Sequence, residues 1–501
     1  MTTKQFLPYV VVVLMAVLLG VVEGDFLYTA QEQSLFLHTP LFFRQQMVAA
    51  GGLLTWAGCY LTQFFYYPML GAGLLGLLWL LLMWLLVRTF RLKDSWPTLV
   101  PIACLLLTVV TLGYWVYYLK LRGALFDATL GTLVAVSLVW LYRSLRRPWL
   151  RTLFVPVAAC VGYPLFGFYG LWATLLMGLT AWSTKGSNRI ADTALALLAV
   201  VAVPLIGYYT IYHETNLVNI YWTALPIFAM HGHSYFAYHL PYIALVLTVT
   251  LLPLTSHLSP LTAHLSLLTL TAIAVTLFWY KDDNFHRELA MRRSIDNVQW
   301  EQVLRTAGGA KGEPTRAMCM MQNLALFRTG QHGDQMFQYP QGAKRPNAPF
   351  TTRMVHTVGK MLYLQYGIPN YCYRWCMEDG VEYGWTVEKL KLMTLCSLLN
   401  GESVAAQRFI NLLKKTDFQT SWARHYEEYP YRPQLVTADP MLKPILPLLR
   451  DDNFLTADQS QQELFLVEHF LSTVGTTPEQ QQLYRFAARY YRRNRQPIIE
   501  R

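Results

Sequence analysis

Long apolar runs, each bounded by charged or turn-forming residues, dominate the chain as far as Tyr280. A helix needs about 20 mainly apolar residues to cross a bilayer. The fifth and sixth runs are separated only around Pro164, so they also fit a re-entrant pair or a single kinked helix. The runs predict about nine membrane-spanning helices, near residues 6–22, 69–87, 98–118, 124–141, 152–167, 169–183, 193–212, 240–258 and 263–280.

The apolar pattern changes to helical spacing in the later part of the chain. Helix-like runs end at Gly330, Gly367 and Gly401, at a nearly regular interval. An interval of about 35 residues is the length of one tetratricopeptide-type helix pair. Each glycine is predicted to close the first helix of a pair in a left-handed conformation, which costs least without a Cβ. Residues 286–501 are therefore predicted to form a soluble solenoid of three to five helix pairs.

Individual helices of this tail can be placed from the same spacing. Residues 402–413 predict an amphipathic helix with Val404, Ala405, Phe409 and Leu412 on its apolar face. Further helices are predicted at 300–307, 461–474 and 478–493. Strand signals are nearly absent, so the fold class is all-α: a membrane bundle over 1–280 followed by a tetratricopeptide-like helical repeat.

Charge supports this division. Only 14% of the 501 residues are charged, and 54% are hydrophobic, whereas soluble proteins carry about 25% charged residues. Charged side chains occupy about 7% of positions 1–280 and about 23% of positions 281–501. Secreted, cytosolic and disordered chains are excluded, because none carries so many long apolar runs.

The basic residues also predict the orientation. If the N-terminus is cytoplasmic, the inner loops hold ten Lys and Arg side chains and the outer loops three, as the positive-inside rule requires. The first run is predicted to be an uncleaved helix, since it is longer than the usual signal core. The tail then lies outside the cytoplasm, which in a bacterial inner membrane is the periplasm. Its basic end, around Arg492 and Arg493, fits solvent or anionic lipid, and no nucleic-acid partner is predicted.

Four stretches carry a resemblance to a known family: residues 32–37, Phe42 with Phe43, residues 51–53 and residues 61–72. They look like the entry region of an uncharacterised family of bacterial inner-membrane proteins, which also continue into a helical-repeat tail. This resemblance covers nearly the whole chain and implies a domain of unknown function without an activity.

The layout resembles, more distantly, membrane glycosyltransferases of the C-type fold, with a long acidic outer loop after the first helix. That resemblance implies a sugar taken from a polyprenyl-phosphate carrier, and an acidic residue of this loop acting as base or metal ligand. The loop offers Asp25, Glu32 and Glu23 as catalytic candidates. It lacks the adjacent acidic pair seen in many such enzymes, which leaves the base and a divalent metal open.

Sugar transfer sets two chemical requirements. An acceptor hydroxyl needs a carboxylate to take its proton, and a phosphate leaving group needs a cation nearby. Arg44, Lys120 and Arg122 are the outer-loop cations, and Asp127 lies close enough to Arg122 to share the same cavity. Their simpler interpretation is snorkelling to lipid headgroups for the cations and an ordinary boundary position for the acids.

Metal ligands are the remaining candidates. His213, Glu214, His231, His233 and His239 lie close together in the sequence, but their spacing is no zinc signature. Cys372 and Cys376 are one helical turn apart without a second ligand pair, so no zinc site is predicted. Asp192 comes shortly after Arg189 and is predicted to form an ion pair with it.

Two functional hypotheses remain open. One is a glycosyltransferase with a lipid-linked donor, whose repeats provide a platform for the acceptor or a periplasmic partner. The other is a non-enzymatic membrane scaffold for envelope assembly that binds partners through its repeats. A transporter is disfavoured, because the apolar runs show no internal repeat.

Overall fold

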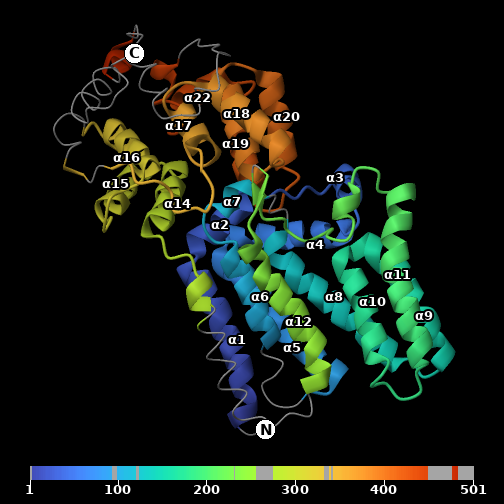
Figure 1. The fold of residues 1–501 in the computed structure, drawn as a ribbon. Helices are drawn as coiled ribbons and strands as arrows, with labels where there is room; N and C mark the ends of the chain where they lie inside the picture. The colour runs from blue at the N-terminus through green and yellow to red at the C-terminus, as the bar shows by residue number, and fades with distance from the viewer. Residues whose placement is uncertain are drawn as a thin grey trace. The chain divides into compact units, whose positions relative to one another are not determined.

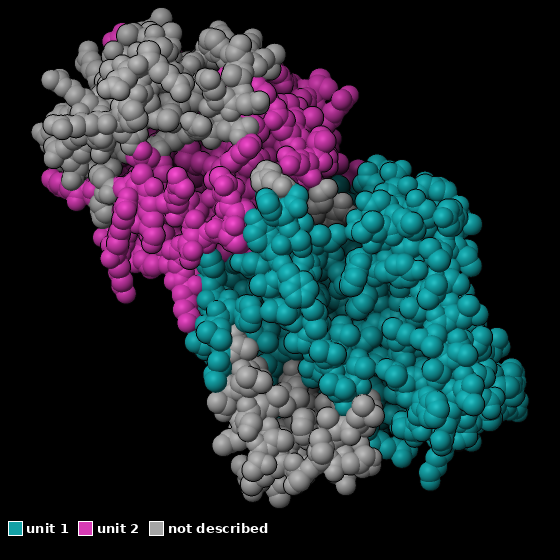
Figure 2. Space-filling view, in the orientation of Figure 1, with its two compact units in different colours: residues 1–112, 119–280 teal, residues 113–118, 281–501 magenta. Residues whose placement is uncertain are grey.

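The computed structural model divides the chain into two compact units (Figure 2). Unit 1 comprises residues 1–112 and 119–280, and unit 2 comprises residues 113–118 and 281–501. Helix accounts for 71% of the structure and strand for 1%, so the all-α prediction is confirmed. The structure describes residues 3–92, 99–119, 123–230, 232–255, 273, 275–331, 338–339, 342–449 and 477–482.

Unit 1 is a bundle of apolar helices (Figure 1). One short hairpin, β1 (Ala229–Met230) paired antiparallel with β2 (His233–Ser234), interrupts it. Its helices are α1 (Thr3–Val22), α2 (Gly24–Glu32), α3 (Pro40–Gln46), α4 (Gly52–Thr62), η1 (Gln63–Tyr66), α5 (Pro68–Phe90), α6 (Leu99–Val110), α8 (Ala124–Ser144), α9 (Pro148–Phe166), α10 (Phe168–Thr180), α11 (Arg189–Thr210), η3 (Leu217–Asn219), η4 (Phe236–His239) and α12 (Leu240–Thr255).

Four helices of the described chain, α5, α8, α9 and α11, are long and apolar enough to cross a membrane. The bent pair α1 and α2 passes the same test together, and shorter apolar helices occur over Val100–Val110, Phe168–Thr180 and Phe236–Leu251. These helices are consistent with membrane association. The count of nine spans stays a prediction, and most of the predicted span 263–280 lies outside the described residues.

The ambiguous stretch around Pro164 forms two helices, α9 and α10, separated by Gly167. Gly167 has φ +57°, a value that favours glycine. The Gly162 and Gly170 backbones approach so closely that a Cβ on Gly170 would lie 2.3 Å from the Gly162 carbonyl carbon. The stretch is therefore a tight helical hairpin, and the single kinked helix is excluded.

The third predicted span extends too far. Helix α6 ends at Val110, and residues Gly113–Tyr118 belong to unit 2. Within unit 2, α7 (Trp115–Tyr118) is buried: Trp115 is 2% and Val116 1% exposed. Its aromatic and aliphatic side chains suit a protein core as well as a membrane, which explains the error.

Unit 2 is built from short helices. They are α7, α14 (Asp283–Asp296), α15 (Trp300–Gly308), α16 (Arg316–Arg328), η6 (Met354–His356), α17 (Gly359–Gln365), α18 (Pro369–Glu382), α19 (Val387–Leu399), α20 (Ser403–Leu413), α21 (Thr420–His425), α22 (Pro433–Ala438) and η7 (Leu446–Leu448). The predicted helix 300–307 is confirmed as α15, whereas 461–474 and most of 478–493 lie outside the described residues.

The three repeat glycines adopt the predicted conformation. Gly330, Gly367 and Gly401 have φ of +71°, +80° and +73°, and they follow α16, α17 and α19. Helices α17 with α18 and α19 with α20 form consecutive pairs. Residues 338–339 and 342–356, between Gly330 and α17, hold only the short η6. A regular tetratricopeptide repeat therefore stays a prediction.

The predicted apolar face of α20 is wrong. Val404 is 69% exposed, whereas Ala406, Ile410 and Leu413 are fully buried. Both sets follow helical spacing and differ by a rotation of about 100°, because neighbouring residues are that far apart around a helix. Contacts with neighbouring helices decide between them.

Gly367 and Gly401 make a matched pair for testing the helix turns. A Cβ on Gly367 would lie 2.3 Å from the Leu448 carbonyl oxygen, whereas a Cβ on Gly401 meets no described atom within 4 Å. Gly401→Ala adds only left-handed backbone strain, about 1 kcal/mol. Gly367→Ala adds steric overlap and should cost about 2–4 kcal/mol. Hydrogen exchange of α17 and α18 in the full-length protein measures the difference, and equal losses would refute the predicted close packing at Gly367.

Candidate functional site

The break between α1 and α2 carries two of the predicted catalytic acids. The two helices bend by 75°, and Glu23 lies at the corner. Glu23 is 1% exposed, and its carboxylate accepts a hydrogen bond of 2.9 Å from the Trp279 indole. Asp25, in the first turn of α2, is only half-buried. Asp25 is therefore better placed than Glu23 to meet a substrate.

The third predicted acid, Glu32, lies at the other end of α2 and is buried. A seven-residue separation corresponds to about 10 Å along a helix, so Asp25 and Glu32 share one face without forming a close pair. Next to Glu32, Gln31 donates to Gln63 at 3.1 Å, and Gln63 donates to Ser34 at 2.8 Å. These amides fix α2 against η1.

Asp127 meets the same connecting segment from the other side. It lies in the first turn of α8 and is 8% exposed. An ideal Cβ on Gly58 of α4 would be 1.9 Å from Asp127 Oδ1, and one on Gly123 would be 2.4 Å from the Gly58 carbonyl carbon. Only glycines permit this approach of α4 to α8. The segment from α4 to η1 thus contacts both the helix of Glu32 and the carboxylate of Asp127.

The Asp127 carboxylate lies in an apolar environment. Its Oδ1 is buried without a hydrogen-bond partner among the described residues, and so is the Tyr169 hydroxyl. Tyr169 interacts electrostatically with Asp127, Tyr242 and Cys104. These groups come from α8, α10, α12 and α6, so four helices converge on one polar cluster. A carboxylate in such a position within a membrane helix is by default a functional-site hypothesis.

The other predicted residues are not brought together by the described structure. Arg44 is exposed on the last turn of α3, whereas Lys120, Arg122 and His231 lie outside the described residues. His213 and Glu214 are exposed. No group of three metal-ligating side chains occurs in the described part of the chain.

The predicted ion pair between Asp192 and Arg189 is wrong. The Asp192 carboxylate is completely buried and accepts hydrogen bonds of 2.6 Å each from the Tyr142 and Thr152 hydroxyls. Arg189 is exposed, and no ion pair joins it to Asp192 in the described structure. Neighbouring helices supply the donors, which a local spacing rule does not detect.

Unit 2 contains a buried charged network that was not predicted from the sequence. Asp379 accepts from Lys360 Nζ at 2.5 Å and contacts His356 Nδ1 at 2.8 Å. Burial alone favours the neutral carboxyl, but Lys360 and His356 hold the pKa of Asp379 below its usual value. The rings of Tyr118, Tyr383 and Trp375 surround His356.

A second part of this network joins α14 to α19 and to residues 113–118. Arg292 pairs with Glu388, and both are buried. Glu288 accepts from Thr315 and, at 2.9 Å, from the Tyr114 hydroxyl. These charged side chains are buried and link separate helices, so they organise the core of unit 2. Arg292 lies next to Arg293, Asp379 follows Glu378 and Glu388 precedes Lys389, so the charge pattern of the sequence does not single out the buried residues.

The fold and these sites define a class: a helical protein with apolar helices long enough to cross a membrane and a second unit of short helices. The model of the family of unknown function DUF6057 matches residues 2–491. The chain therefore belongs to this family, and the predicted resemblance to an uncharacterised family is confirmed. No curated protein and no solved structure matches the chain.

Glu288 predicts a pH dependence of unit 2. Burial raises the pKa of Glu288 to about 7, although hydrogen bonds from Thr315 and Tyr114 oppose the rise. A raised carboxyl pKa contributes stability below the unfolded pKa, near 4.5, that is lost as the pH rises through about 7. The full loss is on the order of 3 kcal/mol.

The measurement is hydrogen exchange of α14 in the full-length protein between pH 5 and pH 8, corrected for intrinsic exchange. Protection should fall with rising pH in the wild type and change much less in Glu288→Gln, whose amide cannot ionise. Equal pH dependence of the two proteins would contradict the assignment. Glu378→Gln, which alters an exposed carboxylate in an ion pair with Arg374, is the control.

Proposed function

We propose that this chain is an integral membrane glycosyltransferase that takes a sugar from a polyprenyl-phosphate carrier. The site lies at the end of unit 1 where α1 ends, on the side away from the cytoplasm. The observation that carries the proposal is the break at Glu23, which turns α2 across that end and holds the half-buried Asp25 there. The helix of Glu32 and the carboxylate of Asp127 contact the same connecting segment.

Each residue has a chemical role in this proposal. Asp25 takes the proton of the acceptor hydroxyl while its oxygen bonds to the anomeric carbon. The bond between that carbon and the phosphate oxygen breaks, and the polyprenyl phosphate leaves with the electron pair. Glu32 is the second candidate base. Glu23 is the third candidate base. Because its carboxylate already accepts a hydrogen bond from the Trp279 indole, it suits the role of a positioning residue better.

Asp127 serves substrate binding. Its buried Oδ1 has no donor among the described residues, so a sugar hydroxyl that reaches it gains a hydrogen bond to a desolvated carboxylate. The phosphate requires a cation, and the proposal assigns it to Arg44, Lys120 or Arg122. Unit 2 then lies on the same side of the membrane and presents its helices to the acceptor or to a protein partner.

Amide substitutions separate catalysis from scaffolding. Asp25→Asn keeps size and most hydrogen bonds but removes the proton acceptor, so turnover should fall by about 10² or more. Glu32→Gln and Glu23→Gln follow in that order of expected effect. Turnover is measured in membranes as loss of tritiated sugar from polyprenyl-phosphate monosaccharides, and protein level serves as the folding control.

The scaffold alternative predicts the opposite result. There, all three amide variants complement a gene deletion fully, whereas Gly367→Ala, which disrupts unit 2, abolishes function. That outcome would end the glycosyltransferase proposal. An exposed acid outside the site, Glu214→Gln, is the matched control and should retain full activity.

A further inference from the structure

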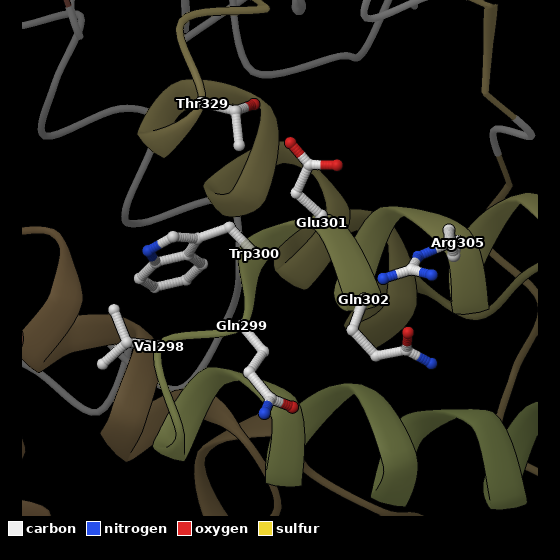
Figure 3. Close-up of a pocket in the computed structure, with 7 residues that line it drawn as sticks. All are labelled: Val298, Gln299, Trp300, Glu301, Gln302, Arg305 and Thr329. Carbon is white, nitrogen blue, oxygen red and sulfur yellow. The ribbon is translucent and has the colours of Figure 1, made fainter.

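A surface pocket of ≈ 590 Å³ lies in unit 2. Trp300, Glu301, Gln302 and Arg305 project from α15, and Thr329 comes from the end of α16 (Figure 3). Val298 and Gln299 precede the helix. The volume of the pocket is in the range of small-molecule sites.

The backbone at the pocket is held in a fixed shape. Val298 has φ +58°, an unusual conformation for a β-branched residue. Its N–H donates to Ile295 at 2.9 Å, and the next N–H donates to Ser294 at 2.8 Å. These bonds close α14 and turn the chain into α15, so Trp300 is positioned by backbone geometry.

The Trp300 ring is also supported from outside the pocket. The Arg328 guanidinium lies 6.0 Å from the ring centroid. Arg328 itself donates to the Pro444 carbonyl at 2.6 Å and the Gln365 carbonyl at 2.5 Å. The half-buried indole is therefore a fixed aromatic surface.

The polar lining indicates the class of ligand. The charges of Glu301 and Arg305 cancel, which disfavours a strongly charged ligand. Two amides, a carboxylate and a guanidinium line the pocket and supply both donors and acceptors, as sugar hydroxyls require, since each hydroxyl both donates and accepts. An aromatic face suits the C–H face of a pyranose ring. An extended peptide would instead need a strand edge or an apolar groove.

From this combination we infer that the Trp300 pocket binds a neutral saccharide. The inference rests on the proposed function in one respect, since it identifies the bound sugar as part of a glycan acceptor. Trp300 provides the stacking surface, whereas Gln299, Gln302, Glu301 and Arg305 bind hydroxyl groups. Unit 2 would hold the acceptor chain by this pocket.

The test uses the full-length protein in lipid nanodiscs, because glycoside detergents would compete. Maltotriose, cellotriose and chitotriose are titrated separately by calorimetry and ligand-observed NMR. At least one should bind the wild type, and Trp300→Ala should weaken it at least about tenfold. Trp300→Phe, which keeps an aromatic ring, should lower the affinity about threefold or less. Gln302→Ala, at an exposed position, should weaken binding about threefold or more without affecting folding.

The control is Trp385→Ala, at a 40% exposed tryptophan of the same unit, which should leave affinity unchanged. The inference is overturned if no trisaccharide binds the wild type or if the Trp300→Ala variant binds with wild-type affinity. It is also overturned if Trp385→Ala weakens binding as much as Trp300→Ala does. Asp25→Asn should keep saccharide binding. Binding without sugar transfer in the wild type would refute only the proposed function, and transfer without binding would refute only this inference.

Discussion

A carboxylate taken out of water must meet a cation or a hydrogen-bond donor, and the organisation of both units follows from this constraint. In unit 2, Lys360 and His356 meet Asp379, and α17 and α18 are held together by that contact. In unit 1, two hydroxyls from α8 and α9 meet Asp192. Asp127 differs, because its Oδ1 has no described partner. The proposed substrate-binding role of Asp127 rests on this difference.

The same constraint relates the fold of unit 1 to the proposed chemistry. Helices that are apolar along their length offer few places for a polar group, so polar residues collect where helices end or break. The break at Glu23 and the first turn of α8 are two such places, and the glycine contact of α4 with α8 connects them. The acids of the proposed reaction are thereby carried on helix ends, while the long helices provide a frame for them.

Local features were predictable from the sequence and long-range ones were not. The positive φ of Gly367 and Gly401 follows from helix ends that need no distant contact. The face of α20 depends on its neighbours, so spacing alone placed Val404 inside. Residues 113–118 were assigned to a membrane helix because aromatic side chains fit either interior. His356, Lys360 and Asp379 meet only after α17 and α18 pack, and their separation in sequence conceals the network.

The proposed sugar transfer takes place at the end of unit 1 where α1 ends, away from the cytoplasm. Sealed membrane vesicles of known orientation test it most directly, with tritiated polyprenyl-phosphate sugar placed in one leaflet and release of label followed over time. The account predicts wild-type turnover only when the donor lies in the leaflet at the end of α1. Turnover only from the cytoplasmic leaflet, or no turnover with any monosaccharide donor, would contradict it.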